Sequence, residues 1–123
     1  MNGLGDVTLV DINEFLEYDK LHSKKFNRIL DDSLNILSET HQFDLIVQDG
    51  DHTFNHVKKE IKLILRNNML NNYYVWAHDY FMREKVPQCE VWRAWDDMKH
   101  NFDQFEGFVD SISNCGCSIA KKI

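Results

Sequence analysis

The fold is decided by residues 43–56, which read Phe-Asp-Leu-Ile-Val-Gln-Asp-Gly-Asp-His-Thr-Phe-Asn-His. The apolar run Leu45-Ile46-Val47 is too short for a helix and predicts a strand buried on both faces. The polar run Asp49-Gly50-Asp51-His52 follows it at once. Because open α/β sheets bind their ligands at the carboxyl ends of such strands, we expect a ligand site here.

A second strand with a similar ending follows further along the chain. Residues 73–77, Tyr-Tyr-Val-Trp-Ala, predict another buried strand, and His78-Asp79-Tyr80 comes directly after it. Between the two strands, apolar positions from Phe54 to Leu65 recur with helical spacing, which predicts a helix from Thr53 to about Arg66. Thr53 or Asp51 is the expected cap of its first turn. A strand, a helix and a strand in this order predict a parallel βαβ unit.

The rest of the chain continues this alternation. Before residues 43–56, we expect a strand at Val7–Val10 ending in Asp11, a helix over 13–25, a weaker strand at 26–30 and a helix of roughly 33–40. After it, we expect a helix of about 89–102, with Val91, Trp95, Met98 and Phe102 on one face, and strands at 105–109 and 118–120. The last two strands are joined by a turn around residues 114–116, so the sheet should end in an antiparallel hairpin.

Composition excludes several classes of protein. With 123 residues, of which 43% are hydrophobic and 28% charged, the chain is expected to form one soluble domain. A net charge of −6 without a basic patch argues against a nucleic-acid partner. Its apolar runs are too short for a transmembrane helix, and its first residues do not resemble a signal peptide, so we expect a cytoplasmic protein with no membrane partner. The three cysteines show no zinc or CxxC spacing and are expected to be reduced thiols.

Acidic and imidazole groups follow four of the expected strands. In a parallel sheet these strand ends lie along one edge, which would bring together Asp11, Asp32, Asp49 to His52, and His78-Asp79. Asp49 and Asp79, with His78 or Asp51, form an oxygen-rich set suited to Mg²⁺. His52 is a candidate general base, because imidazole titrates near neutral pH. Helix capping explains Asp32 and Asp51 equally well, and His78 could instead be bonded to backbone.

Three segments resemble a known family. The runs Asp44–Phe54, Val75–Tyr80 and Val91–Trp95 are similar to those of class I S-adenosylmethionine-dependent methyltransferases. The branch they resemble is that of metal-assisted small-molecule O-methyltransferases related to macrocin O-methyltransferase and cephalosporin hydroxylase. The resemblance implies a Rossmann-like α/β fold with a mostly parallel sheet and an antiparallel C-terminal hairpin at its edge.

The resemblance also implies roles for individual residues. Asp11 matches the acid that binds the ribose hydroxyls of S-adenosylmethionine, and Asp32 and Ser33 match the pair beside the adenine. Asp49, His78 and Asp79 match the ligands of the magnesium ion, and Asp49 is also expected to contact the cofactor. His52 matches the position of the base. The implied reaction is a metal-assisted methyl transfer to the hydroxyl of a small molecule. A non-catalytic interaction module with the same fold and a metal-assisted hydrolase are the alternatives.

One part of the family pattern has no match. The family's first strand, its glycine-rich loop and the following helix should precede residue 1, so we expect residues 1–123 to form a methyltransferase-like domain truncated at its N-terminus. That strand normally lies between the family's second and fourth strands. Either these two strands pair directly, or a second copy or another partner covers the gap. Whether this chain alone is active is left open by the sequence.

Overall fold

The computed structural model describes residues 6–12, 26–82, 86–109 and 115–123. The elements in chain order are β1 (Val7–Asp11), β2 (Phe26–Leu30), α1 (Ser33–Ser38), β3 (Leu45–Gln48), α2 (Phe54–Asn67), β4 (Tyr73–His78), α3 (Val91–Met98), the 3₁₀ helix η3 (Lys99–Asn101), β5 (Gln104–Phe108) and β6 (Cys117–Lys122). The predicted α/β layout is confirmed. The helix expected over 13–25 and most of the turn around residue 114 lie outside the described residues.

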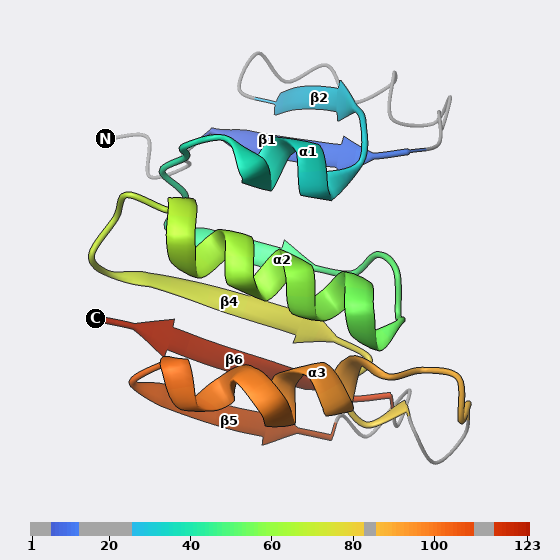
Figure 1. Cartoon of the computed structure of the whole chain (residues 1–123). Helices are drawn as coiled ribbons and strands as arrows, with labels where there is room; N and C mark the ends of the chain where they lie inside the picture. Colours follow the sequence, from blue (N-terminus) through green and yellow to red (C-terminus); the bar gives the residue numbers. More distant parts are fainter. Residues whose placement is uncertain (1–5, 13–25, 83–85, 110–114) are drawn as a thin grey trace.

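The strands form two separate sheets. Strands β1 and β2 pair in parallel, and a second sheet has the order β3-β4-β6-β5. Within it β3 and β4 are parallel, whereas β6 is antiparallel to both β4 and β5, which confirms the C-terminal hairpin. Figure 1 shows β1 to β4 pointing the same way, so their carboxyl ends lie at one edge.

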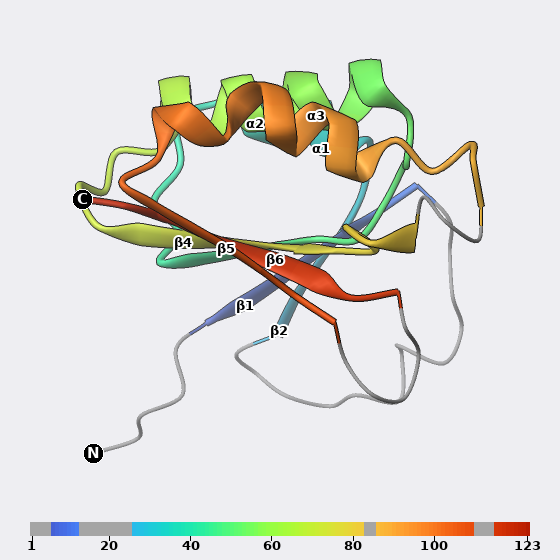
Figure 2. The same cartoon turned by 90° about the horizontal axis from the view of Figure 1, so that it is seen from below.

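The three α-helices lie on one face of the strands (Figure 2). Side-chain hydrogen bonds tie helix α1 to α2. The shortest are from Ser33 Oγ to Glu60 Oε1 at 2.6 Å and from Asn67 Nδ2 to Leu37 O at 2.8 Å. No ladder joins β1 to β3 in the described residues, so the contact between α1 and α2 helps to hold the β1–β2 unit against the larger sheet. In the part of the chain that the structure describes, the helix layer therefore continues across the place where the strands separate into two sheets.

The core lies between the helices and the four-stranded sheet. Its fully buried members include Val57, Ile61 and Ile64 of α2, Val75 of β4 and Trp95 of α3. Burying one such apolar side chain stabilises a fold by roughly 1.5–3 kcal/mol. The predicted inward face of the last helix is confirmed, since Val91, Trp95, Met98 and Phe102 are all buried.

The expectation that β3 and β4 are buried on both faces is wrong for the described structure. Leu45 and Val47 are 53% and 56% exposed, and Tyr74 and Trp76 are 40% and 41% exposed. Their neighbours in sequence, such as Val75, face the helices and are buried. The described helices cover one face only, so alternate apolar residues of these strands lie on the other, uncovered face.

Several predicted boundaries shift by a few residues. The helix expected over 33–40 ends at Ser38, and the strand expected at Leu45-Ile46-Val47 extends to Gln48. The helix expected over 89–102 is α-helical only from Val91 to Met98 and tightens into η3 over its last turn. None of the described helices is long and apolar enough to cross a membrane.

Candidate metal and base site

Asp79 follows β4 in a conformation that few side chains adopt. Its φ is 62°, in the left-handed region, and its side chain is 8% exposed. Its N–H donates to Gly116 O at 3.0 Å, and its own carbonyl accepts from Met82 N at 3.1 Å. Gly116 is irreplaceable in this contact, because its φ is 64° and a Cβ there would lie 2.5 Å from Phe108 O. Backbone strain of this kind concentrates at functional sites, where surrounding contacts maintain it.

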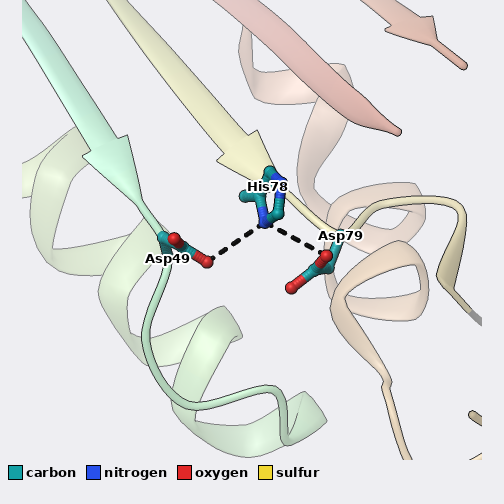
Figure 3. A group of neighbouring side chains, drawn as sticks. All are labelled: Asp49, His78 and Asp79. Atoms are coloured by element: carbon teal, nitrogen blue, oxygen red, sulfur yellow. Dashed lines mark ion pairs between the residues drawn. The ribbon is translucent and has the colours of Figure 1, made fainter. Parts of the chain in front are cut away.

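Three side chains converge at the ends of β3 and β4 (Figure 3). His78 Nδ1 lies 3.2 Å from Asp49 Oδ1 and 3.1 Å from Asp79 Oδ1, and one potential ligand atom from each residue falls within 4.8 Å of the others. Despite these distances, the buried Nδ1 atom makes no hydrogen bond of acceptable geometry. A buried nitrogen that faces two carboxylates without a hydrogen bond calls for another partner.

The residues fit a divalent cation. Carboxylate oxygens are the ligands that Mg²⁺ and Mn²⁺ prefer, and the imidazole of His78 adds a nitrogen ligand of the kind that transition metals bind. Asp49 is 57% exposed at its side chain, so an ion can reach the group from solvent, whereas Asp79 lies at its buried end. The predicted set Asp49, His78 and Asp79 is thus brought together by the fold.

His52 lies on the far side of the same buried carboxylate. Its Nε2 atom is 3.0 Å from Asp79 Oδ2, and its side chain is 38% exposed. The loop that carries it is anchored because the His52 carbonyl accepts from Glu90 N at 2.8 Å. If Nε2 carries the proton that this contact needs, Nδ1 is the atom available to accept another proton.

The three further residues predicted to contact a cofactor are Asp11, Asp32 and Ser33, and two of them make hydrogen bonds within the protein. Asp11 is the last residue of β1, so it lies at the same edge of the strands as Asp49 and His78. Asp32 caps α1, because its Oδ1 accepts from Leu34 N at 2.9 Å, and the hydroxyl of Ser33 donates to Glu60. Thus Asp32 makes the capping bond that was the alternative explanation for this residue.

Asp51 is the other acid for which capping was the alternative. Its Oδ1 accepts from Thr53 N at 2.7 Å, just before α2 begins, and Thr53 itself makes no side-chain capping bond. Hydrogen bonds from the Thr53 side chain and then from its N–H hold the pKa of Asp51 below its ordinary value, with smaller contributions from His56 and His52. Asp51 therefore shapes the turn between the site and α2.

A buried polar network behind Asp49 was not predicted. Gln48, the last residue of β3, donates from Nε2 to Glu60 Oε2 at 2.5 Å and accepts at Oε1 from Trp95 Nε1 at 2.9 Å. Glu60 is only 5% exposed and also accepts from Ser33. This network joins β3 to all three helices and fixes the residue that precedes Asp49. Its sequence signal is Glu60, a charged residue among the buried apolar positions of α2.

No protein-family model and no curated protein sequence matches the chain. Solved methyltransferase structures do. The N-methyltransferase NodS from Bradyrhizobium japonicum WM9 matches with a TM-score of 0.63 and 12% identity over 95% of this chain and 72% of its own. Podospora anserina PaMTH1, bound to S-adenosylhomocysteine, matches with a TM-score of 0.63 and 12% identity over 96% of this chain and 61% of its own.

A second NodS structure, in complex with S-adenosyl-l-homocysteine, gives a TM-score of 0.64 at 10% identity, over 95% of this chain and 65% of the NodS chain. The described chain therefore spans less than two thirds of PaMTH1 and of this NodS chain. Sequence identities this low establish the fold alone. The chain has the α/β fold of these methyltransferases.

Proposed function

We propose that this chain belongs to a metal-assisted, S-adenosylmethionine-dependent methyltransferase that acts on a hydroxyl of a small molecule. The observation that carries the proposal is the buried Nδ1 of His78, which faces the carboxylates of Asp49 and Asp79 without a hydrogen bond. It lies at strand ends of a methyltransferase fold, where such α/β sheets bind their ligands. Two of the matched structures contain S-adenosylhomocysteine, the product that methyl transfer leaves behind.

The carboxylates at the strand ends suit the positive charges of the cofactor. S-adenosylmethionine carries a positive sulfonium and a positive ammonium group, and Asp11, Asp32 and Asp49 line the strand ends with negative charge. Asp32 uses Oδ1 for its capping bond, so Oδ2 is the oxygen assigned to the cofactor. Asp11 is assigned to the ribose hydroxyls on the strength of the family resemblance.

Asp49, His78 and Asp79 would hold the divalent cation. When bound there, such a cation lowers the pKa of a coordinated hydroxyl and so prepares it for attack. His52 then takes the hydroxyl proton at Nδ1, while Asp79 orients its ring through Nε2. The methyl group passes in line from sulfur to the acceptor oxygen, so one C–S bond breaks as one C–O bond forms. The protein contributes positioning and charge to this step.

Titration calorimetry with S-adenosylmethionine, with and without Mg²⁺ or Mn²⁺, tests the proposal. We expect cation binding to be lost in the double variant Asp49→Asn, Asp79→Asn and kept in Asp44→Asn. The control removes the same kind of charge at the opposite end of β3. Absence of cofactor binding under all conditions would support the non-catalytic module instead. Turnover of simple esters that depends on added metal and not on the cofactor would support the hydrolase.

A further inference from the structure

Glu60 is a buried carboxylate that the proposed reaction does not use. It is 5% exposed and lies in α2 between the fully buried residues Val57 and Ile64. Taking a carboxylate out of water is costly, and an apolar side chain of similar size is often as stabilising at a buried position or more so. A glutamate on the buried face of α2 therefore points to a role besides stability.

The hydrogen bonds around Glu60 have a defined direction on one side. The Trp95 indole N–H can only donate, so the side-chain oxygen of Gln48 faces Trp95, at 2.9 Å. The NH₂ group of Gln48 therefore faces Glu60 and donates to its Oε2 atom at 2.5 Å. The other oxygen of Glu60, Oε1, accepts from Ser33 Oγ at 2.6 Å and lies 3.0 Å from His56 Nε2. Both oxygens of this carboxylate therefore have partners within the protein.

Two partners of Glu60 are next to residues of the proposed site in the sequence. Ser33 is the first residue of α1 and directly follows Asp32, whose Oδ1 atom caps that helix. Gln48 is the last residue of β3 and directly precedes Asp49. No ladder joins β1 to β3 in the described residues, so contacts between side chains help to set how the two sheets lie relative to each other. Glu60 makes such a contact close to the edge of the strands where the site lies.

We propose that Glu60 is a positioning residue, which sets the spacing between the cation-binding side and the cofactor-binding side of the site. It holds Asp49 in place through Gln48, and it holds Asp32 in place through Ser33. This inference rests on the proposed function, which assigns the cation to one of these sides and the cofactor to the other. Glu60 does not belong to the proposed ligands and acts only through its hydrogen bonds. Loss of a residue that orients metal ligands typically lowers metal affinity by roughly 10–100-fold.

Calorimetry with Mn²⁺ alone, on the whole chain, tests the cation side. Glu60→Met keeps the length of the side chain and removes both of its oxygens, so we expect it to weaken Mn²⁺ binding about tenfold. Glu60→Gln removes the charge and keeps the hydrogen bonding. Its oxygen accepts from Gln48, and its NH₂ group donates to the hydroxyl of Ser33, which can also accept. We expect Glu60→Gln to bind Mn²⁺ within about threefold of the unchanged chain, because only a distant charge is lost.

Ile64→Ala is the control for an effect of stability alone. It removes core packing about one helical turn further along α2 and leaves the hydrogen bonds of Glu60 in place. We expect it to lower the urea midpoint, as Glu60→Met does, and to keep Mn²⁺ affinity within about threefold. Circular dichroism verifies that each variant is folded during the titration. If Glu60→Met does not fold, Gln48→Leu cuts the same link to Asp49, and Glu60→Gln still tests whether charge or hydrogen bonding matters.

A measurement without metal separates this inference from the proposed function. In NMR spectra of the ligand-free chain, we expect Glu60→Met to shift the signals of the Asp49 carboxylate and of the Leu34 amide, which donates to Asp32. Neither residue is adjacent to Glu60 in sequence, so such shifts report a change in how the two sides are held. Both signals should stay close to their original positions in Glu60→Gln and in Ile64→Ala.

Three outcomes would overturn the role of Glu60. Equal losses of Mn²⁺ affinity in Glu60→Gln and Glu60→Met would show that the charge matters and the hydrogen bonds do not. A loss in Ile64→Ala that follows its lower stability would reduce Glu60 to a structural residue. Normal Mn²⁺ binding by Glu60→Met would exclude a positioning role. If the unchanged chain binds no Mn²⁺, the proposed cation site is wrong, and unshifted ligand-free signals in Glu60→Met would then overturn the positioning role separately.

Discussion

The Nε2 atom of His52 lies 3.0 Å from Oδ2 of Asp79, so one buried carboxylate joins the loop after β3 to the end of β4. This contact gives His52 a defined orientation although its side chain is 38% exposed. The oxygens of Asp79 serve different neighbours, since Oδ1 faces His78 and Oδ2 faces His52. The cation and base functions proposed for this site can therefore be separated by mutation.

Replacing His52 should affect proton transfer more than cation binding. In His52→Gln we expect methyl transfer to an acceptor hydroxyl to fall by about 10²–10⁴, the usual contribution of a general base. Cation affinity, measured by calorimetry, should change little, because Asp49, His78 and Asp79 remain. His100→Gln, in the exposed η3 turn, is the matched control. An equal loss of both properties in His52→Gln would assign His52 to the cation instead.

The strained backbone at Asp79 predicts an unusual order of stabilities. A left-handed φ disfavours alanine relative to glycine by roughly 1–2 kcal/mol, so Asp79→Gly should be more stable than Asp79→Ala by about that amount. Both variants lose a carboxylate, and both should lose cation binding. Urea denaturation without metal measures the difference. Equal stability of the two variants would mean that the φ of 62° carries no strain.

The network behind β3 should contribute to stability. Gln48→Leu would remove the partner of Glu60 Oε2 and of the Trp95 indole N–H inside the core, while Glu60 Oε1 keeps its hydrogen bond from Ser33. Each unsatisfied buried group costs about 1–3 kcal/mol, so we expect a loss of at least about 2 kcal/mol in the free energy of unfolding. Gln42→Leu, at an exposed position, should change it by less than about 0.5 kcal/mol. A Gln48→Leu variant as stable as the control would contradict the importance of these hydrogen bonds.

Asp51 should make stability depend on pH at the acidic end. Its pKa is lowered in the folded chain by hydrogen bonds from the Thr53 side chain and the Thr53 N–H. A carboxyl whose folded pKa is depressed adds stability above its unfolded pKa, roughly pH 4, and that stability disappears as the pH falls through the folded pKa. The advantage of the unchanged chain over Asp51→Asn should therefore be full at pH 6 and shrink below about pH 4. Urea midpoints across this range provide the measurement, and a difference that grows on acidification would contradict the assignment.

Local patterns predicted the elements and the strand-end residues. The short apolar run Leu45-Ile46-Val47 identified β3, and helical spacing after Thr53 identified α2, because both patterns reflect periodicity along a few residues. The parallel direction of β3 and β4 follows from the helix between them, and it brings Asp49 near His78 and Asp79. The set of candidate ligands could be predicted for this reason.

Other features of the fold and of the site depend on contacts between distant parts of the chain, so only the tertiary structure decided them. The apolar character of Leu45 and Val47 does not predict that both side chains are exposed, since exposure depends on which face of the sheet the helices cover. Hydrogen bonds of Ser33 to Glu60, and of Gln48 to Glu60 and Trp95, join residues from four elements, and no local pattern records them. The orientation of His78 Nδ1 toward two carboxylates likewise requires the strand register and the left-handed φ of Asp79. By itself the sequence determined which residues end the strands, because that depends on a few neighbouring residues. How those residues face one another depends on how the helices pack against the strands, which only the tertiary structure decided.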